Sequence, residues 1–452
     1  MRRTRVVIVG AGFAGYHAAR KLARTVSPRD TEVVLVNPTD YFLYLPLLPE
    51  VATGILDPRA VSVSLPGTLP NVRLVLGEVA AIDPDARVLS YTDPEDHTGS
   101  LSFDRLILAA GSVHKLLPIP GLAEHGHGFR GIPESLYFRD HVTRQIELAA
   151  ATSDPRERAQ RCTFVVVGAG YTGTEVAAQG SVFTRLLAGR HPELRDQPMR
   201  WMLLDIAPRV LPQQDARLSR TADTVLRERG VEVRTKTSID EATKTGVRLS
   251  TGESVPTRSL IWCVGVRPDP LVEELGLDTT QGRLVVDDYL RVPGYPHLFA
   301  CGDVAAVRDT RHPGRLAPMT AQHAVREGRL TARNVAASLG HRTPARYRHR
   351  DLGFVVDLGG GKAAADPFHI PLSGLLANAI TRGYHLMAMP ANRLRVAIGW
   401  ALDAILPRQT VQLGLVRSGT VPLDTMSPEV PHLRSTVDVE RGRPTTDRQD
   451  DD

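Results

Sequence analysis

The chain has 452 residues, of which 42% are hydrophobic and 23% charged, and its formal net charge is +5. These values are ordinary for a globular protein and predict two or three domains. Cys162, Cys263 and Cys301 are far apart and form no C-x-x-C pair, which argues against a disulfide framework or a metal site. No signal peptide is expected before the first apolar run, and no stretch of about 20 apolar residues predicts a transmembrane helix.

The chain begins with a buried strand and a glycine-rich turn. Residues 6–9 form an apolar run, after which Gly10, Gly12 and Gly15 follow the pattern G-x-G-x-x-G and small residues begin a helix. In such a unit the first glycine permits a tight turn and the second lets a pyrophosphate approach the backbone, while the third lets helix and strand pack closely. Because the helix start also offers N–H groups to phosphates, this segment predicts a dinucleotide site.

The next segments continue the alternation of strand and helix. Residues 31–36 predict a second parallel strand, and the apolar, proline-bearing stretch 40–58 predicts a core-lining loop or the wall of a pocket. Residues 71–93 alternate like a strand meander, and 101–112 read as a strand that ends in Ala-Gly.

The opening pattern returns more than a hundred residues later. Residues 164–167 are the apolar run, and Gly168, Gly170 and Gly173 occupy the glycine positions. One copy of the pattern is weak evidence, but two copies, each between a strand and a helix, predict two dinucleotides on one chain with electrons moving between them.

The residue that ends each second strand should contact a nucleotide ribose. In the second unit the strand 200–205 ends at Asp205, and a carboxylate there favours NADH because it repels a 2′-phosphate, although Arg209 lies nearby in the sequence. In the first unit the position is Asn37, whose amide still offers hydrogen bonds, and Asp40 is a substitute in the following loop.

The remaining segments complete both units. Residues 229–253 predict a small meander, 259–268 a strand, 298–307 a strand, turn and helix, and 320–339 a helix. The charged, proline-bearing end of the chain predicts disorder over 421–452.

Residues 371–419 predict two helices divided by Pro390. Arg393, Arg395 and Arg408 lie at the ends of the second helix, where Asp403 is the only acid. One broad apolar face is predicted for Leu394, Ile398, Trp400, Ala401, Leu402, Ile405 and Leu406. Such a helix either lies in the interface of an anionic membrane or packs on the body of the protein or on a second subunit.

The combined motifs resemble the two-dinucleotide-domain flavoprotein reductases, which bind FAD at the N-terminal fold and a nicotinamide nucleotide at an inserted copy of it. "ILAAGS" (107–112) resembles the strand end that leads between the domains, and "LFACGD" (298–303) resembles the second FAD motif, in which Asp303 holds the ribityl chain. The resemblance implies an α/β fold with an FAD-binding domain at 1–118 and 285–345 and an NAD(H)-binding domain at 119–284. A C-terminal amphipathic helical segment follows at 346–420.

Within these reductases the chain is similar to the type II NADH dehydrogenases, which are single-subunit NADH:quinone oxidoreductases. "PLLPEVATGIL" (46–56), "IWCVGVRPDPL" (261–271) and "AQHAVREG" (321–328) carry this likeness. The sequence departs from the family pattern at Leu45, at Pro49-Glu50 where the family has Tyr-Gln, and at Arg326 where it has glutamine.

This resemblance assigns roles to particular residues. It makes Glu175 the acid beside the nicotinamide and flavin, and Gln322 the residue that donates to a quinone carbonyl. Arg326 and Lys362 are implied on the quinone side, with a solvated surface lysine as the alternative for Lys362. The implied FAD contacts are Gly10, Ala11, Gly12, Phe13, Ala14, Gly15, Asn37, Val79, Ala110, Gly111, Asp303 and Ala321. The implied NAD contacts are Gly168, Gly170, Tyr171, Thr172, Gly173, Asp205 and Gly265.

The function implied is hydride transfer from NADH to FAD and electron transfer to a quinone of the menaquinone or ubiquinone class, without proton pumping. The enzyme is expected on the cytoplasmic face of the membrane as a peripheral protein, with a homodimer as one arrangement and no nucleic-acid partner. The alternatives are a soluble NAD(P)H-dependent flavoprotein reductase with a protein or small-molecule acceptor and a non-catalytic FAD-binding redox sensor. Chemistry at paired cysteines is disfavoured, since Cys301 alone is expected near the flavin.

Overall fold

Two parallel sheets form the framework of the protein. The computed structural model describes residues 3–310, 312–349, 353–367 and 372–423. The first sheet has five strands in the order β22-β9-β1-β2-β5, and every neighbouring pair is parallel. Its strands are β1 (Thr4–Val9), β2 (Thr31–Asn37), β5 (Arg73–Leu76), β9 (Arg105–Leu108) and β22 (Leu298–Ala300). β1 is fully buried from Val6 onward because helices and small sheets cover both faces, which explains its unbroken apolar run.

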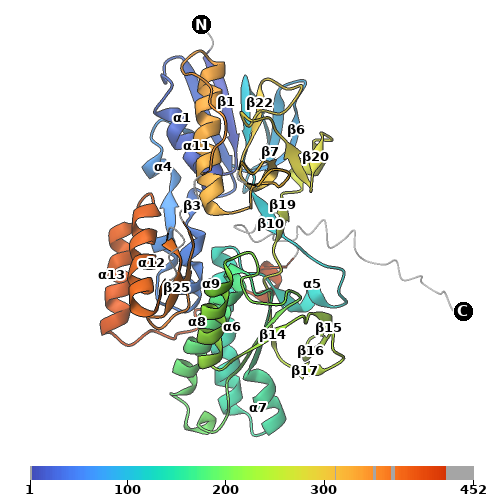
Figure 1. Cartoon of the computed structure of the whole chain (residues 1–452), viewed down its shortest axis with the longest axis vertical. Coiled ribbons are helices and arrows are strands. Elements are labelled where there is room, and N and C mark those ends of the chain that lie inside the picture. Colours follow the sequence, from blue (N-terminus) through green and yellow to red (C-terminus); the bar gives the residue numbers. More distant parts are fainter. Residues whose placement is uncertain (1–2, 311, 350–352, 368–371, 424–452) are drawn as a thin grey trace, which may run out of the picture.

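Helices α1 (Phe13–Ala23) and α11 (Ala321–Ser338) pack against each other beside the first sheet (Figure 1). Their close approach requires Gly328, where an added Cβ would lie 2.1 Å from the carbonyl oxygen of Ala14. The beginning of α11 is therefore held next to the first glycine turn, as the site described below requires.

The second sheet repeats the order of four strands of the first, since β18-β12-β13-β14 corresponds to β9-β1-β2-β5. It reads β11-β18-β12-β13-β14 and is also parallel throughout, with β12 in the central place that β1 occupies in the first sheet. Its strands are β11 (Gly126–His127), β12 (Thr163–Val167), β13 (Arg200–Asp205), β14 (Val231–Thr235) and β18 (Ser259–Trp262). The helices of this unit are α6 (Ile132–Ala151), α7 (Pro155–Arg161), α8 (Tyr171–Ala188) and α9 (Ala216–Glu228). The repeated sequence is thus a repeated structure.

The chain passes between the two sheets along a pair of short strands. β10 (Ser112–His114) pairs antiparallel with β19 (Val266–Pro268), so the outgoing and returning segments run side by side (Figure 1). After the return, β22 joins the first sheet beside β9.

Smaller elements surround the framework. Three antiparallel or mixed sheets comprise β6 (Glu78–Asp83), β7 (Val88–Thr92) and β8 (Thr98–Ser102); β15 (Ile239–Thr243), β16 (Gly246–Leu249) and β17 (Ser254–Pro256); and β20 (Thr279–Thr280), β21 (Arg283–Val285) and β23 (Ala305–Ala306). The short helices are α5 (Leu122–His125), η2 (Pro192–Leu194), α10 (Leu271–Glu274), η3 (Gly302–Val304) and η5 (Ser418–Thr420).

The C-terminal helices lie to one side of the two sheets (Figure 1). α12 (Gly374–Ala388) and α13 (Arg393–Ile405) follow the sheet β24 (Val355–Asp357), β25 (Ala363–Ala365) and β26 (Leu372–Ser373), which confirms two helices divided near Pro390. The segment between β2 and β5 contains β3 (Tyr41–Leu43), η1 (Leu45–Leu47), α2 (Leu48–Ala52), α3 (Pro58–Val61), β4 (Ser62–Ser64) and α4 (Leu65–Thr68), of which α3 contacts α13. Over the described ranges, no helix combines the length and apolar character needed to cross a bilayer.

Some expectations from the sequence are wrong in detail. The helix predicted within 298–307 is only η3 followed by a short strand, because Gly302 has a left-handed φ of +75° and Cys301 and Ala305 are extended. The first strands of the predicted meanders, β5 and β14, join the parallel sheets instead. The prediction of disorder from residue 421 onward is wrong for Val421 and Leu423, which are buried in the core with exposed fractions of 5% and 0%. Residues 424–452 lie outside the described residues.

Trp400 also departs from the predicted apolar outer face of α13. Its indole is 6% exposed and its Nε1–H donates to the carboxylate of Glu50, so it points into the body of the protein. The indole N–H requires a polar partner when buried, and Glu50 supplies it.

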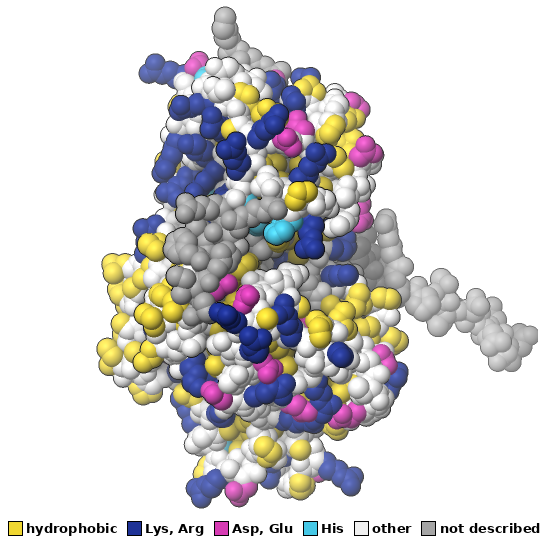
Figure 2. All heavy atoms as spheres, in the orientation of Figure 1, with side chains coloured by type: hydrophobic (Ala, Val, Ile, Leu, Met, Phe, Trp, Pro, Cys, Tyr) yellow, Lys and Arg dark blue, Asp and Glu magenta, His cyan; other side chains and the backbone are white. Residues whose placement is uncertain are grey.

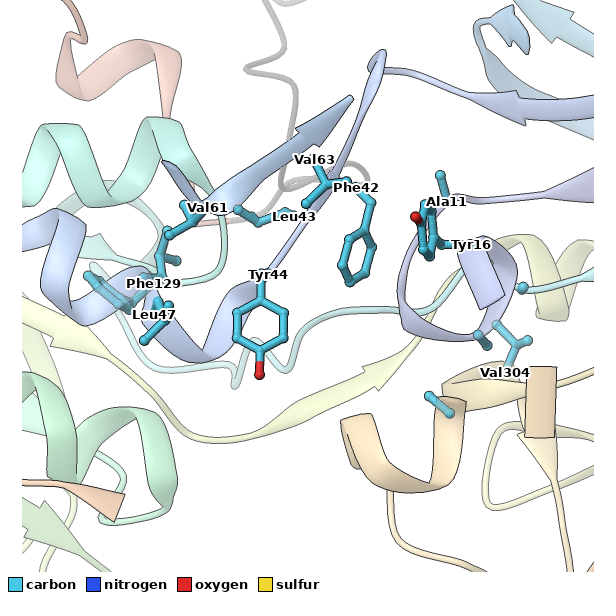
Figure 3. Packing of buried hydrophobic residues seen from close by; sticks show 14 of the residues in the cluster. Ala11, Tyr16, Phe42, Leu43, Tyr44, Leu47, Val61, Val63, Phe129 and Val304 are labelled. Carbon is cyan, nitrogen blue, oxygen red and sulfur yellow. The ribbon is translucent and has the colours of Figure 1, made fainter. Parts of the chain in front are cut away.

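Aromatic stacking fills the cores of both units. Tyr16 of α1 stacks on Phe42 of β3 with ring centroids 4.8 Å apart, and Figure 3 shows these side chains among the apolar residues around β3. In the second unit Trp201 stacks on Phe164 at 4.7 Å and donates to the hydroxyl of Thr184 at 3.0 Å.

The Trp201 packing makes a prediction about Gly180, which lies in α8. A Cβ at Gly180 would lie 2.3 Å from the indole ring, so Gly180→Ala should destabilise the protein by about 1–3 kcal/mol through overpacking. Gly383, in α12, has no atom within 4 Å of an added Cβ, and Gly383→Ala should instead stabilise by roughly 0.5–1 kcal/mol. Thermal unfolding midpoints compare the two variants, and the reverse order contradicts the packing described.

Candidate active site

A cavity of about 790 Å³ lies between the first glycine turn and the start of α8, the helix that begins directly after the second glycine turn. The first unit contributes the turn after β1, and the second contributes the first turn of α8. Residues that line it include Gly10, Ala11, Gly12, Phe13, Ala14, Asn37, Val79, Ala110, Gly111, Ser112, Tyr171, Thr172, Glu175, Asp303, Ala321 and Gln322. Segments far apart in the sequence therefore share one space.

The three glycines of the first turn have the conformations that the pattern predicts. Gly10 has a φ of +89°, and a Cβ there would lie 2.5 Å from the carbonyl oxygen of Ala109. A Cβ at Gly15 would lie 1.8 Å from the carbonyl oxygen of Gly10. At Gly12 a Cβ would meet nothing within 4 Å, so the space beside this residue is open to a ligand.

The second turn repeats this geometry. Gly168 has a φ of +103°, and its Cβ would lie 2.3 Å from the carbonyl oxygen of Cys263, while a Cβ at Gly173 would lie 1.8 Å from that of Gly168. Gly170, like Gly12, has open space beside it. The second turn is therefore not filled by protein, and a phosphate can reach its backbone.

Asn37 and Asp205 perform the same local task in the two units. Asn37 Oδ1 accepts the N–H of Ala11 at 2.8 Å, and Asp205 Oδ2 accepts the N–H of Ala169 at 2.6 Å. Each side chain therefore fixes the residue between the first two glycines. Their remaining lone pairs suit ribose hydroxyls, as predicted from their place at the strand ends.

Arg209 and Asp40, which lie near Asp205 and Asn37 in the sequence, do not take part in these contacts. Arg209 donates to the carbonyl oxygens of Pro212 and Gln214, at 3.1 and 2.9 Å, which ties down its own loop. Asp40 is not among the residues that line the cavity, so Asn37 keeps the position at the ribose end of the first unit.

Asp303 lies in the cavity wall and is held by residues that the sequence reading missed. The hydroxyl of Ser112 donates to Asp303 Oδ2 at 2.6 Å, and the guanidinium of Arg130 donates to Ser112 Oγ at 3.2 Å. Glu327 of α11, 1% exposed, accepts the N–H of Gly302 at 2.7 Å, and burial raises its pKa to about 8. Glu327 could have been identified from the sequence as a carboxyl group among small residues on a predicted helix.

Glu175 lines the cavity from the first turns of α8. Its Oε1 accepts the backbone N–H of Asp357 at 3.0 Å. Burial, and then the negative charge of Asp357, raise the pKa of Glu175 well above the usual value for a glutamate. The structure thus places a carboxyl group that favours its protonated form in the wall of the cavity.

Among the residues predicted on the quinone side, the structure brings only Gln322 to the cavity. Gln322 Nε2 donates to the carbonyl oxygen of Gly353 at 2.8 Å. Arg326 contacts Gln322 Oε1 and His349 Nδ1 behind the cavity wall. Lys362 forms an ion pair with Glu228 at 2.6 Å in which both side chains are about half exposed, which corresponds to the surface alternative.

Residues of α12 complete the cavity and were not predicted to do so. Ile380, Tyr384 and His385 line it, and the hydroxyl of Tyr44 lies 3.1 Å from His385 Nδ1. Burial lowers the pKa of His385 to about 4, so the ring is neutral near pH 7. The apolar stretch 40–58 forms part of the wall through Tyr41 and Leu45, as one of its two interpretations proposed.

The cysteines are unsuited to thiolate chemistry. Burial raises the pKa of Cys263 and of Cys301 to about 12 and that of Cys162 to about 11. Only the thiolate is a good nucleophile, so these thiols behave as small buried side chains.

The chain matches a family model described as pyridine nucleotide-disulphide oxidoreductase over residues 4–328, which gives the class of protein. It is 30% identical over 427 residues to the type II NADH:quinone oxidoreductase Ndh of Mycobacterium tuberculosis, covering 90% of this chain and 89% of that protein. It is 32% identical to the type II NADH:quinone oxidoreductase NdhA of the same organism, and the match covers 89% of this chain and 87% of NdhA. It is 31% identical to the demethylphylloquinone reductase NdbB of a Synechocystis species, and that match covers 88% of this chain and 96% of NdbB. The chain belongs to the type II NADH:quinone oxidoreductase family.

The fold agrees with this assignment. A structure of NDH2 from Plasmodium falciparum in complex with NADH has a TM-score of 0.83 and 17% sequence identity to the chain, and covers 91% of this chain and 100% of that one. At this identity the likeness concerns the arrangement of the two sheets and the C-terminal helices.

The two open glycine positions allow the nucleotide sites to be tested separately. Both Gly12 and Gly170 have backbone angles that alanine adopts, so alanine should leave the fold intact and obstruct only a ligand. Gly12→Ala should weaken FAD binding, and Gly170→Ala should raise the KM for NADH with normal flavin content. Each change should be about tenfold to a hundredfold, corresponding to one charge-assisted hydrogen bond of about 1.5–3 kcal/mol.

Flavin absorbance per protein and the KM for NADH measure these effects. Loss of flavin in Gly170→Ala, or a changed KM with full flavin affinity in Gly12→Ala, contradicts the assignment of the turns.

Proposed function

We propose that this chain oxidises NADH and reduces a membrane quinone at the cavity described above, with FAD as its bound cofactor. The observation that carries this proposal is the cavity lined both by the first glycine turn and by Tyr171, Thr172 and Glu175, which follow the second glycine turn on α8. When bound, FAD supplies the ability to accept electrons from a nicotinamide and to deliver them to a quinone. The open space at Gly12 and the hydrogen-bonded Asp303 carboxylate fit a pyrophosphate and a polyol chain.

The residues of the two turns bind and orient the nucleotides in this proposal. N–H groups at the start of α1 and α8 face the pyrophosphates, since both helices begin directly after the open glycines. Asp205 selects NADH over NADPH because its carboxylate repels a 2′-phosphate. Tyr171, which stacks on Phe354 with centroids 5.1 Å apart, lines the cavity at the start of α8.

Two polar side chains are then placed to act on the quinone. Gln322 uses one N–H on Gly353, and the other N–H of this amide can donate to a quinone carbonyl, a bond that strengthens as the oxygen gains negative charge. Glu175 holds a proton in the cavity wall and can deliver it to a reduced quinone oxygen.

The C-terminal helices provide the proposed contact with an anionic membrane surface. Leu375, Met387, Leu394 and Ile405 are 72–80% exposed, and Figure 2 shows hydrophobic side chains gathered on this side of the protein. A groove beside them is lined by Arg20, Arg393 and Arg395 together with Leu394 and Ile398. Because α12 also lines the cavity, a lipid-dissolved quinone would meet the apolar surface and the site on the same helix. The same apolar surface also suits contact with a second copy of the chain.

Anaerobic half-reactions test the proposed activity. NADH should bleach the flavin absorbance of the purified protein, and a menaquinone or ubiquinone analogue should restore it. NADPH should bleach it more slowly because of Asp205. Flavin that stays reduced after both quinones contradicts quinone reduction, and flavin that NADH never bleaches contradicts the NADH step.

Vesicle sedimentation tests the proposed membrane surface. The double substitution Leu394→Ser and Ile405→Ser should weaken binding to phosphatidylglycerol vesicles at least about tenfold, because a buried leucine-sized side chain contributes about 1.5–3 kcal/mol. Leu148→Ser on α6 is the matched control, since Leu148 is 41% exposed on another face. Equal sedimentation of both variants contradicts the membrane role. A smaller mass in solution for the double variant alone assigns the surface to a second copy of the chain.

A further inference from the structure

Three carboxyl groups from distant parts of the chain meet behind the wall of the cavity. Glu50 lies on α2, Glu175 on α8 and Asp357 at the end of β24. Glu50 is only 3% exposed. Of the three, Glu175 alone lines the cavity, so the other two act through it.

Hydrogen bonds join the three groups. The indole N–H of Trp400 donates to Glu50 Oε2, and the carboxyl groups of Glu50 and Asp357 are hydrogen-bonded to each other. The backbone N–H of Asp357 donates to Glu175 Oε1 at 3.0 Å. Because two carboxylates cannot hydrogen-bond to each other without a proton, the contact between Glu50 and Asp357 requires one shared proton.

The remaining contacts assign that proton to Glu50. Asp357 Oδ1 accepts the N–H of Gly359 at 2.8 Å and Oδ2 accepts the amide of Gln179 at 3.4 Å, contacts that suit an ionised carboxylate. Glu50 is 3% exposed, and among the described residues its carboxyl group accepts the N–H of Trp400 and contacts Asp357. The pair therefore carries one proton and one negative charge.

Two arginines lie near the negative charge of the Glu50–Asp357 pair. Arg382 of α12 and Arg229 after α9 attract the charge of Asp357. The guanidinium of Arg382 lies over the indole of Trp400, 5.0 Å from the ring centroid, and Arg229 donates to the carbonyl oxygen of Gly359. Arg185 and Glu228 act on the cluster only through Arg229.

The pKa values have the direction that this geometry requires. Burial, and then the charge of Asp357, raise the pKa of Glu50 to about 8, and burial raises that of Asp357. Burial also raises the pKa of Glu175, and the negative charge of Asp357 raises it further.

The proposed reaction needs a proton from outside the substrates. A quinone becomes a quinol by taking up two electrons and two protons, whereas the hydride of NADH carries two electrons and one proton. One further proton therefore comes from solvent in each turnover and must be held at the cavity when the quinone oxygen gains its charge.

We propose that Glu50 and Asp357 form a carboxyl–carboxylate pair whose single negative charge keeps Glu175 protonated and ready to pass a proton to the bound quinone. The inference rests on the proposed quinone reduction and makes Glu50 and Asp357 positioning residues for Glu175.

Shape-conserving variants of the holoenzyme separate the proton of the pair from its charge. Glu50→Gln removes the shared proton, leaves the charge on Asp357 and keeps an oxygen for the indole N–H of Trp400. Adding Asp357→Asn removes the charge and keeps an oxygen for the N–H of Gly359. Glu228→Gln, which changes the exposed pair with Lys362 and reaches the cluster only indirectly, through Arg229, is the matched control.

The first readout is the rate of flavin reoxidation by a quinone analogue as a function of pH. The rate should fall as pH rises through the pKa of Glu175, since only its protonated form donates. Removing the negative charge of the pair lowers that pKa. In the double variant Glu50→Gln/Asp357→Asn, the alkaline limb, which is the fall of the rate at high pH, should therefore move to lower pH by on the order of one unit. This shift should be larger than in Glu50→Gln alone. Glu228→Gln should not move the alkaline limb.

The second readout is the infrared C=O stretch of protonated carboxyl groups in the resting protein. One such band should be lost in Glu50→Gln and a different one in Glu175→Gln. An unmoved alkaline limb in the double variant, or an unchanged infrared band in Glu50→Gln, overturns the inference. Bleaching by NADH and reoxidation by quinone in the unmodified protein report separately on the proposed function, which stands even if the pair has no effect.

Discussion

The close approach of each glycine turn to the end of a neighbouring strand is the constraint on which the rest of this structure depends. Gly10 lies against the carbonyl of Ala109, and Gly168 lies against that of Cys263, at distances that leave no room for a side chain. This approach places the start of a helix at the carboxyl end of a parallel sheet, where its N–H groups face a ligand. The chain contains two copies of it: the first lines the cavity, and the second directly precedes α8, whose first residues line the same cavity.

Charge in the cavity wall is controlled by burial more than by ion pairs. Glu175 and Glu327 both have raised pKa values with burial as the main cause, although they serve different purposes. Glu327 holds the turn at Gly302, so its role is to shape the site. Glu175 faces the cavity, where a carboxyl group with a raised pKa suits the proposed reaction, which ends in proton uptake.

The C-terminal helices connect the apolar surface of the protein to its chemistry. α12 exposes Leu375 and Met387 on the outside and places Tyr384 and His385 in the cavity wall. α13 places Leu394 and Ile405 outside but turns Trp400 inward to Glu50. One pair of short helices thus serves both a proposed lipid contact and the buried carboxyl cluster.

The sequence alone determined the two glycine turns, the parallel strands before them and the division of the C-terminal segment at Pro390, because backbone conformation and local hydrophobic periodicity set these features. It also pointed to Asn37, Asp205, Asp303, Glu175 and Gln322, which lie at strand or helix ends of fixed spacing. Only the tertiary structure decided that Lys362 pairs with Glu228 at the surface, that Trp400 points inward, and that Glu50, Glu175 and Asp357 meet. Such contacts join segments hundreds of residues apart, and their partners follow from how the sheets and helices pack rather than from any pattern along the chain.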